Sequence, residues 1–108
     1  MDTVTVTKEN FDAEVLNSEV PVVVEFWMPM CGYCKRLAPV IDRLATKYKG
    51  KLVFAKMNSI EEDEIFSRYG GEVNPTLYLF NKGVPGEKLV APSSQAEVED
   101  WIKNQTAI

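Results

Sequence analysis

The residues in this sequence with the clearest chemistry are its two cysteines. Cys31 and Cys34 are the only thiols in the chain, and Gly32 and Tyr33 separate them. A pair at this spacing can form half of a metal site, a structural staple or a redox pair. Structural zinc requires a full set of cysteine or histidine ligands, and the chain has two cysteines and no histidine. No metal site is therefore predicted within one chain, although a dimer that pools two pairs into a zinc or iron–sulfur site stays open.

The cysteines stand at a predicted junction between a strand and a helix. Val22–Trp27 is a nearly continuous apolar run, the pattern of a strand buried on both faces. Beyond the cysteines, apolar residues recur at helical spacing from Leu37 to Tyr48. Because unpaired N–H groups at a helix N-terminus stabilise a thiolate, we expect Cys31 to be the more reactive and more exposed thiol. Cys34 follows one turn later, close enough to form a disulfide. This position favours a redox pair over cysteines that merely pack.

Alternating strands and helices are predicted along the rest of the chain. The predicted strands are residues 3–7, 22–27, 52–58, 76–80 and 87–91. The predicted helices contain the apolar positions of residues 11–16, 37–48, 65–69 and 98–102. The order βαβαβαββα predicts a single α/β domain over residues 1–108, with a mixed five-stranded sheet and four helices that cover both of its faces.

Short polar signals predict where three helices start and where one turn lies. The expected capping residues are Thr7 or Asn10, Ser59 with Glu62, and Ser94 with Glu97. Gly83, Pro85 and Gly86 predict a tight turn that joins the last two strands as a hairpin.

Composition and charge restrict the class of protein. The chain has 108 residues, of which 45% are hydrophobic and 26% are charged, as in a single globular domain. Its net charge of −4 argues against a nucleic-acid binder. The longest apolar run, Val20–Val24, is far shorter than the roughly 18 residues of a membrane span, and the first residues lack the pattern of a signal peptide. We therefore expect a cytoplasmic protein without membrane attachment, and this compartment disfavours a permanent structural disulfide.

The sequence resembles thioredoxins over nearly its whole length. The matching segments are Val24–Trp27, Cys31–Lys35, Ala38–Pro39, Phe54–Asn58, Tyr69–Gly70, Pro75–Leu77 and the terminal helix. The flanks of the cysteines also resemble the catalytic domains of protein disulfide isomerases, notably at Glu25–Phe26, Pro29 and Cys34–Pro39. The resemblance implies the thioredoxin fold and reversible exchange with protein disulfides, in which Cys31 is the nucleophile and Cys34 the resolving cysteine.

The same resemblance implies roles for residues far from the cysteines in sequence. Pro75 matches the family's cis-proline, which lies against the disulfide in a loop that pairs with an extended substrate peptide. Glu25 is expected beneath the site, near Cys34, where it helps to remove the thiol proton, and Lys56 is its expected neighbour. A carboxylate in so apolar a run should have a raised pKa unless Lys56 compensates its charge. A simple buried ion pair is the alternative.

Two departures from the family pattern flank the nucleophile. Tyr33 stands where thioredoxins have proline and disulfide isomerases have histidine. The loss of proline frees a backbone N–H that can donate to the Cys31 sulfur, which should make the pair more oxidising than a typical thioredoxin. Met30 stands where both branches usually have tryptophan, and it either offers a soft docking surface or fills a gap against the neighbouring loop.

Two further departures lie at the expected docking groove. Asn74 precedes Pro75 where the family usually has an apolar or β-branched residue, and its amide can reach substrate or the active-site sulfurs. Ala91–Pro92 replaces a glycine that flanks the groove in thioredoxins. The predicted substrate-binding residues are Gly32, Tyr33, Met30, Asn74 and Pro75.

Electron supply must come from outside the chain, because the sequence has no glycine-rich nicotinamide or flavin fingerprint. No cofactor is predicted beyond the Cys31–Cys34 disulfide. The expected electron donor is a flavoprotein thioredoxin reductase or glutathione. The favoured hypothesis is a monomeric reductant of protein disulfides. The alternatives are a thiol oxidase or disulfide isomerase, and a non-catalytic or metal-bridged dimeric interaction module.

Overall fold

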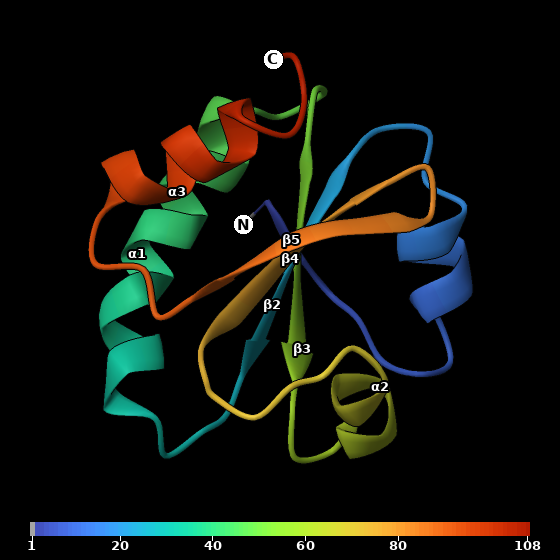
Figure 1. Ribbon diagram of the computed structural model, residues 1–108, viewed down its shortest axis with the longest axis vertical. Helices are drawn as coiled ribbons and strands as arrows, with labels where there is room; N and C mark the ends of the chain where they lie inside the picture. The colour runs from blue at the N-terminus through green and yellow to red at the C-terminus, as the bar shows by residue number, and fades with distance from the viewer. Residues whose placement is uncertain (1) are drawn as a thin grey trace.

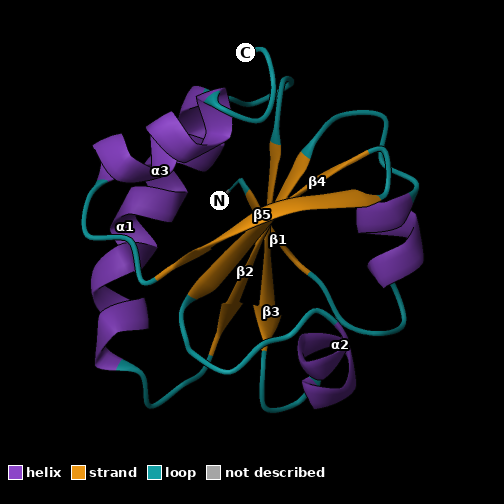
Figure 2. Cartoon of the chain, viewed as in Figure 1, coloured by secondary structure: helices purple, strands orange, loops and turns teal. Residues whose placement is uncertain are grey.

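A five-stranded mixed sheet forms the centre of the computed structural model, which describes residues 2–108. Figure 1 and Figure 2 show this sheet between two layers of helices. The strands are β1 (Thr3–Thr5), β2 (Val22–Trp27), β3 (Val53–Asn58), β4 (Thr76–Asn81) and β5 (Val84–Val90). The helices are the short π-helix η1 (Asp12–Leu16), α1 (Gly32–Lys47), α2 (Asp63–Arg68) and α3 (Gln95–Lys103). The element order is the predicted one.

Strand β2 occupies the middle of the sheet, whose order is β1-β3-β2-β4-β5. It pairs in parallel with β3 and antiparallel with β4. Every residue from Val22 to Phe26 is buried, because other strands flank β2 on both edges and helices cover both of its faces. The apolar run in the sequence reflects this double burial. Beyond Trp27 the chain leaves the sheet and leads directly into the segment that contains the cysteines.

Two hydrophobic clusters, one on each face of the sheet, fix the helices. On the face covered by α1 and α3, the buried side chains include Leu37, Ile41, Leu44, Trp101 and Ile102. On the face covered by η1 and α2, they include Phe11, Val15, Ile65 and Phe80. Strand β2 contributes Val23 to the first cluster and Val24 to the second, since successive strand residues point to opposite faces. The prediction that helices cover both faces is confirmed (Figure 1).

Only the last of the predicted capping residues starts a helix. Ser94 Oγ accepts a hydrogen bond from the Glu97 N–H at 3.1 Å at the start of α3. Ser59 does not cap α2. Instead, Asn58 Oδ1 accepts hydrogen bonds from the N–H groups of Ile60 and Glu61. These bonds keep this stretch a turn, so the helix begins only at Asp63. Helix η1 starts without a side-chain cap. Polar spacing alone does not separate these cases, because a cap and an asparagine turn satisfy the same kind of N–H group.

The hairpin between β4 and β5 turns earlier than predicted. Its two loop residues, Lys82 and Gly83, have positive φ values of 52° and 82°, as a two-residue hairpin turn requires. A Cβ at Gly83 would also lie 2.8 Å from the carbonyl oxygen of Leu16, so glycine is needed there on two grounds. Pro85 and Gly86 consequently lie inside β5, beside a register shift. The edge position of β5 tolerates proline because one side of the strand pairs with nothing.

Candidate active site

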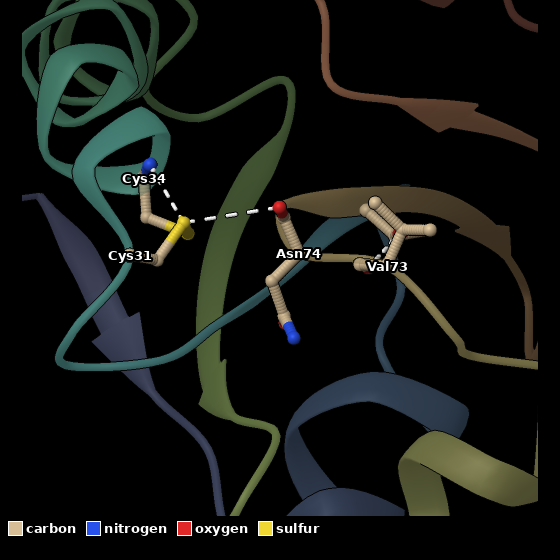
Figure 3. Close-up of a disulfide and its surroundings, with 5 residues drawn as sticks. Cys31, Cys34, Val73 and Asn74 are labelled. Atoms are coloured by element: carbon tan, nitrogen blue, oxygen red, sulfur yellow. Dashed lines mark hydrogen bonds between the residues drawn. A yellow bond between two sulfur atoms is a disulfide. The ribbon is translucent and has the colours of Figure 1, made fainter.

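The Cys31–Cys34 disulfide lies at the N-terminus of α1. Cys31 is the N-cap residue, with extended backbone, and the helix begins at Gly32. The Cys34 N–H donates a hydrogen bond to Cys31 Sγ at 3.0 Å (Figure 3). One of the N–H groups that a helix start leaves without a backbone partner therefore points at this sulfur. After reduction the same N–H is available to stabilise the Cys31 thiolate.

The two sulfurs differ in position more than in exposure. Cys31 is 7% exposed and Cys34 is 5% exposed, so the expected difference in exposure is absent in the disulfide form. Cys31 caps the helix, whereas Cys34 lies inside the first turn and lines a cavity together with Glu25. Cys31 Sγ thus accepts a backbone hydrogen bond, whereas Cys34 shares a cavity with a carboxyl group.

The loop before β4 lies against the disulfide. The Asn74–Pro75 peptide bond is cis, and the carbonyl oxygen of Asn74 lies 3.8 Å from Cys31 Sγ. Thr76 Oγ1 donates to the carbonyl oxygen of Val73 at 2.6 Å, which fixes the loop from the other side. Figure 3 shows the amide of Asn74 pointing away from the sulfurs, which leaves contact with substrate as the other predicted role of this amide. The backbone of Asn74 faces the nucleophile, and its Oδ1 is buried without a hydrogen-bond partner.

Glu25 lies on β2, in the middle of the sheet, and lines a cavity together with Cys34. Its side chain is 1% exposed and its Oε1 has no hydrogen-bond partner. Burial raises the pKa of this carboxyl group to about 7, while the positive charge of Lys56 opposes the rise and the negative charge of Asp42 adds to it. A cavity of about 140 Å³ is lined by both Glu25 and Cys34. The site therefore contains a carboxyl group that exchanges a proton near neutral pH beside the inner cysteine.

Lys56 is adjacent to Glu25 in the sheet but does not pair with it. The two residues are register partners in β2 and β3. Among the ion pairs found in residues 2–108, none joins them. The ammonium group of Lys56 instead lies 5.6 Å from the centre of the Trp27 ring, in cation–π contact. The alternative of a simple buried ion pair is thus excluded by the geometry, and Lys56 compensates only part of the cost of burying the carboxylate.

Tyr33 contacts a part of the chain that no local pattern around it indicates. The N–H that reaches Cys31 Sγ belongs to Cys34, and a proline at position 33 would leave that group in place. The predicted hydrogen bond from the Tyr33 N–H to Cys31 Sγ is therefore not formed in the disulfide. The Tyr33 hydroxyl lies 2.8 Å from the carbonyl oxygen of Ala91 and 3.0 Å from that of Pro92. The sequence indicates at most that a partly buried tyrosine hydroxyl needs a hydrogen-bond partner, and it does not indicate which residue supplies that partner.

Exposed apolar side chains adjoin the segments that meet at the disulfide. Met30, Val73 and Val90 are 87%, 47% and 41% exposed, and each directly precedes a residue of one of these segments. Met30 therefore does not fill a gap, and the alternative of an exposed docking surface agrees with its position. Gly32 is exposed as well, and a Cβ there would make only ordinary contact with Arg36.

Metal chemistry and membrane insertion find no support in the described chain. Among residues 2–108, no group of three or more histidine, cysteine, aspartate or glutamate side chains is arranged to bind a metal ion. No helix of that same stretch combines the length and the apolar character needed to cross a bilayer. The redox group of the site is the disulfide itself.

Comparison with known proteins gives a consistent result. A family model described as Thioredoxin matches residues 2–104. Thioredoxin 1 of a Nostoc strain is 46% identical over 85 residues, which covers 79% of this chain and 79% of that protein. The thioredoxin of Rickettsia felis is 40% identical over 97 residues, or 90% of this chain and 92% of that protein. Thioredoxin M5, chloroplastic, of Oryza sativa subsp. japonica is 42% identical over 89 residues, which covers 82% of this chain and 52% of that protein.

Proposed function

The chain belongs to the thioredoxin family and is a thiol–disulfide oxidoreductase, and from this premise we propose that it reduces protein disulfides, with Cys31 as the attacking sulfur and Cys34 as the resolving sulfur. The observation that carries the assignment is the Cys34 N–H, which points at Cys31 Sγ from 3.0 Å. It favours negative charge on Cys31 and not on Cys34. The position of Cys31 at the tip of α1 supports the same order of attack.

The reaction consists of two exchanges of sulfur for sulfur. The Cys31 thiolate attacks one sulfur of the substrate disulfide, that bond breaks, and the second substrate sulfur leaves as a thiolate. The Cys34 thiolate then attacks Cys31 Sγ, the mixed disulfide breaks, and the first substrate sulfur leaves. The substrate gains two electrons and the Cys31–Cys34 pair loses two, so the step needs no further redox group.

Glu25 is the proposed acceptor of the Cys34 proton. Its pKa of about 7 means that near neutral pH a large fraction of the carboxyl group is ionised and ready to accept a proton. The cavity of about 140 Å³ between Glu25 and Cys34 has room for water, which can transmit the proton. Cys31 does not line this cavity, so the proposed role concerns the resolving step and not the first attack.

Substrate peptides are proposed to bind across the loop of Asn74 and Pro75. The carbonyl oxygen of Asn74 lies beside the nucleophile, where it can accept a hydrogen bond from an extended peptide. Met30 and Val73 supply exposed apolar surface next to that loop. We place the protein in the cytoplasm, as a monomer, with electrons from a flavoprotein thioredoxin reductase or from glutathione; these three statements rest on the sequence and on family membership.

Insulin reduction tests the function and the order of the cysteines. With dithiothreitol as the electron source, catalytic amounts of the protein should accelerate the reduction of insulin. Cys31→Ser should abolish the activity, and Cys34→Ser should accumulate a mixed disulfide between Cys31 and the substrate. Full turnover by Cys34→Ser, or a mixed disulfide through Cys34, would contradict the proposed order.

The reduction potential tests the direction. Because a proline at position 33 would leave the N–H at Cys31 Sγ unchanged, we expect a value near the thioredoxin level of about −270 mV. Equilibration in glutathione buffers of graded ratio, followed by trapping of the thiols, measures it. A value near about −200 mV would instead favour the oxidase or isomerase, or coupling to glutathione.

A further inference from the structure

The Tyr33 hydroxyl links α1 to the segment between β5 and α3. It lies 2.8 Å from the carbonyl oxygen of Ala91 and 3.0 Å from that of Pro92. Within residues 2–108, no other hydrogen bond joins α1 to residues 91–94. A cavity of about 190 Å³ opens between the two, lined by side chains from both. Because apolar packing there is incomplete, the hydroxyl is the direct polar tie between α1 and this segment.

Ala91 adopts a backbone conformation that alanine rarely takes. Its φ of 47° lies in the left-handed region, which the Cβ of an L-residue disfavours. The Ala91 N–H donates to the carbonyl oxygen of Pro75 at 2.9 Å, and its own carbonyl oxygen faces Tyr33. Such conformations persist only where the surrounding structure determines them. Two hydrogen bonds, one on each side of the residue, therefore hold Ala91 in place.

These bonds continue to the segment that touches the nucleophile. Tyr33 binds Ala91, Ala91 binds Pro75, and Asn74, immediately before Pro75, places its carbonyl oxygen 3.8 Å from Cys31 Sγ (Figure 3). The Ala91 N–H is already engaged and Pro92 has no N–H, so the backbone of residues 91–92 can offer a partner only carbonyl acceptors. An extended peptide that brings its own N–H groups fits such a surface.

We propose that Tyr33 is a positioning residue for protein substrates, whose hydroxyl fixes the carbonyl groups of residues 91–92 next to the Asn74–Pro75 loop as a preformed docking edge. The inference rests on the proposed function and adds the structural reason for a tyrosine between the cysteines. Protein substrates meet this edge, whereas a small disulfide needs only the Cys31 sulfur. Loss of the hydroxyl should therefore weaken protein docking and leave the thiol chemistry unchanged.

Tyr33→Phe isolates the hydroxyl. The substitution keeps the ring and the Arg36 guanidinium group, which lies 5.1 Å from the ring centre. We expect KM for insulin to rise about threefold to tenfold, as for the loss of one hydrogen bond, while kcat stays within about twofold. The rate with oxidised glutathione and the reduction potential should not change. Amide exchange at Ala91 should become faster, because the segment loses one of its two ties.

Tyr48→Phe is the matched control. It also removes a tyrosine hydroxyl, one that contacts Glu99 on the side of α1 facing α3, and it should leave KM for insulin unchanged. An equal loss with oxidised glutathione, or a shifted potential, would assign Tyr33 to the thiol chemistry and overturn the inference. Unchanged KM together with unchanged amide exchange would overturn it as well. Failure of the wild-type protein to reduce insulin would instead contradict the proposed function.

Discussion

Two glutamates behave in opposite ways in two regions of the molecule. Glu25 is buried in the middle of the sheet, and burial raises its pKa to about 7. Glu99 lies where α3 meets α1, and it accepts a hydrogen bond from Lys47 at 2.7 Å and another from the Tyr48 hydroxyl. These bonds, with a further one from Gln95, lower the pKa of Glu99 to about 2. The same carboxyl group is thus easily protonated in one place and firmly ionised in the other.

The difference separates a carboxylate that supports the fold from one that the fold must tolerate. At Glu99 every partner stabilises the ionised form, so its charge contributes to the packing of α3 on α1. At Glu25 no ion pair with Lys56 forms, and one oxygen lacks a hydrogen-bond partner. An acid whose charge is only partly compensated inside an apolar core destabilises the folded state, and groups of this kind cluster at functional sites. Glu25 and Cys34 line one cavity, and the proposed transfer of the Cys34 proton would give that cost a function.

The largest expected effect is on the pH dependence of stability. The pKa of Glu25 rises from an ordinary value of 4.5 to about 7 on folding, so folding favours the protonated form. Below about pH 4.5 the group is protonated in both states and costs nothing. As the pH rises to about 7 the unfolded state ionises first, and the wild type should lose about 3 kcal/mol relative to Glu25→Gln. Denaturant unfolding of the oxidised proteins at pH 5 and pH 8 measures this difference in stability. An equal difference between wild type and Glu25→Gln at both pH values would contradict the prediction.

The next largest effect is on the resolving step. Glu25→Gln removes the proposed proton acceptor, so attack of Cys34 on the mixed disulfide should slow by about 10- to 100-fold at pH 7. The first attack by Cys31 should keep its rate, because Cys31 does not line the cavity that contains Glu25. Rapid quenching of single-turnover reactions separates the two steps.

The pH profile provides the control for that result. At high pH, hydroxide can remove the Cys34 proton without help from Glu25, so the variant should approach the wild-type rate. Glu99→Gln, the matched glutamate substitution, should change neither step. A slower first attack, or a defect that persists at high pH, would show that Glu25 acts in another way.

The sequence predicted most of the fold because the main signals are local. Burial of β2 on both faces requires an apolar run, and that run is visible in Val22–Trp27. The turn between β4 and β5 was misplaced because Gly83, Pro85 and Gly86 are all turn residues. What selects Gly83 is a close approach to the carbonyl oxygen of Leu16, a contact between distant parts of the chain. Local patterns therefore identify the elements, while some boundaries depend on tertiary contacts.

The same limit applies to the site. The spacing of the cysteines identified Cys31 and Cys34 as a redox pair. The family resemblance placed Glu25 near them, and its position in an apolar run indicated a raised pKa. The hydrogen bond from Tyr33 to Ala91 spans 58 positions, and no local pattern encodes it. The direction of the Asn74 amide depends on how its loop packs (Figure 3). Contacts of this kind follow from the assembled fold and are absent from the spacing of residues.

A smaller effect is expected at Glu99. The folded-state pKa of this carboxyl is depressed, so its contribution is present above about pH 4.5 and is lost as the pH falls toward 2. The Lys47 side chain is 52% exposed, and exposed ion pairs contribute about 0.2–1 kcal/mol. Glu99→Gln should therefore destabilise the protein by about 1 kcal/mol at pH 7 and by less at pH 3. Glu25 therefore changes the stability between about pH 4.5 and 7, and Glu99 changes it between about pH 2 and 4.5. If both substitutions changed the stability over the same pH range, the comparison would be contradicted.

The smallest effect tests how Lys56 acts on Glu25. Its charge lowers the pKa of Glu25 without forming an ion pair, so Lys56→Met should raise that pKa further. Fewer molecules then have an ionised Glu25 at pH 7, and the resolving step should slow by about twofold there and recover as the pH rises. Lys35 lines the same cavity but does not contribute to the shift of Glu25, which makes Lys35→Met the matched control. A displaced pH profile for Lys56→Met alone would identify Lys56 as the residue that keeps the buried acid near neutrality. Equal shifts in both variants would mean that any positive charge at the cavity suffices, and a slower rate at every pH would make Lys56 part of the packing beneath Trp27.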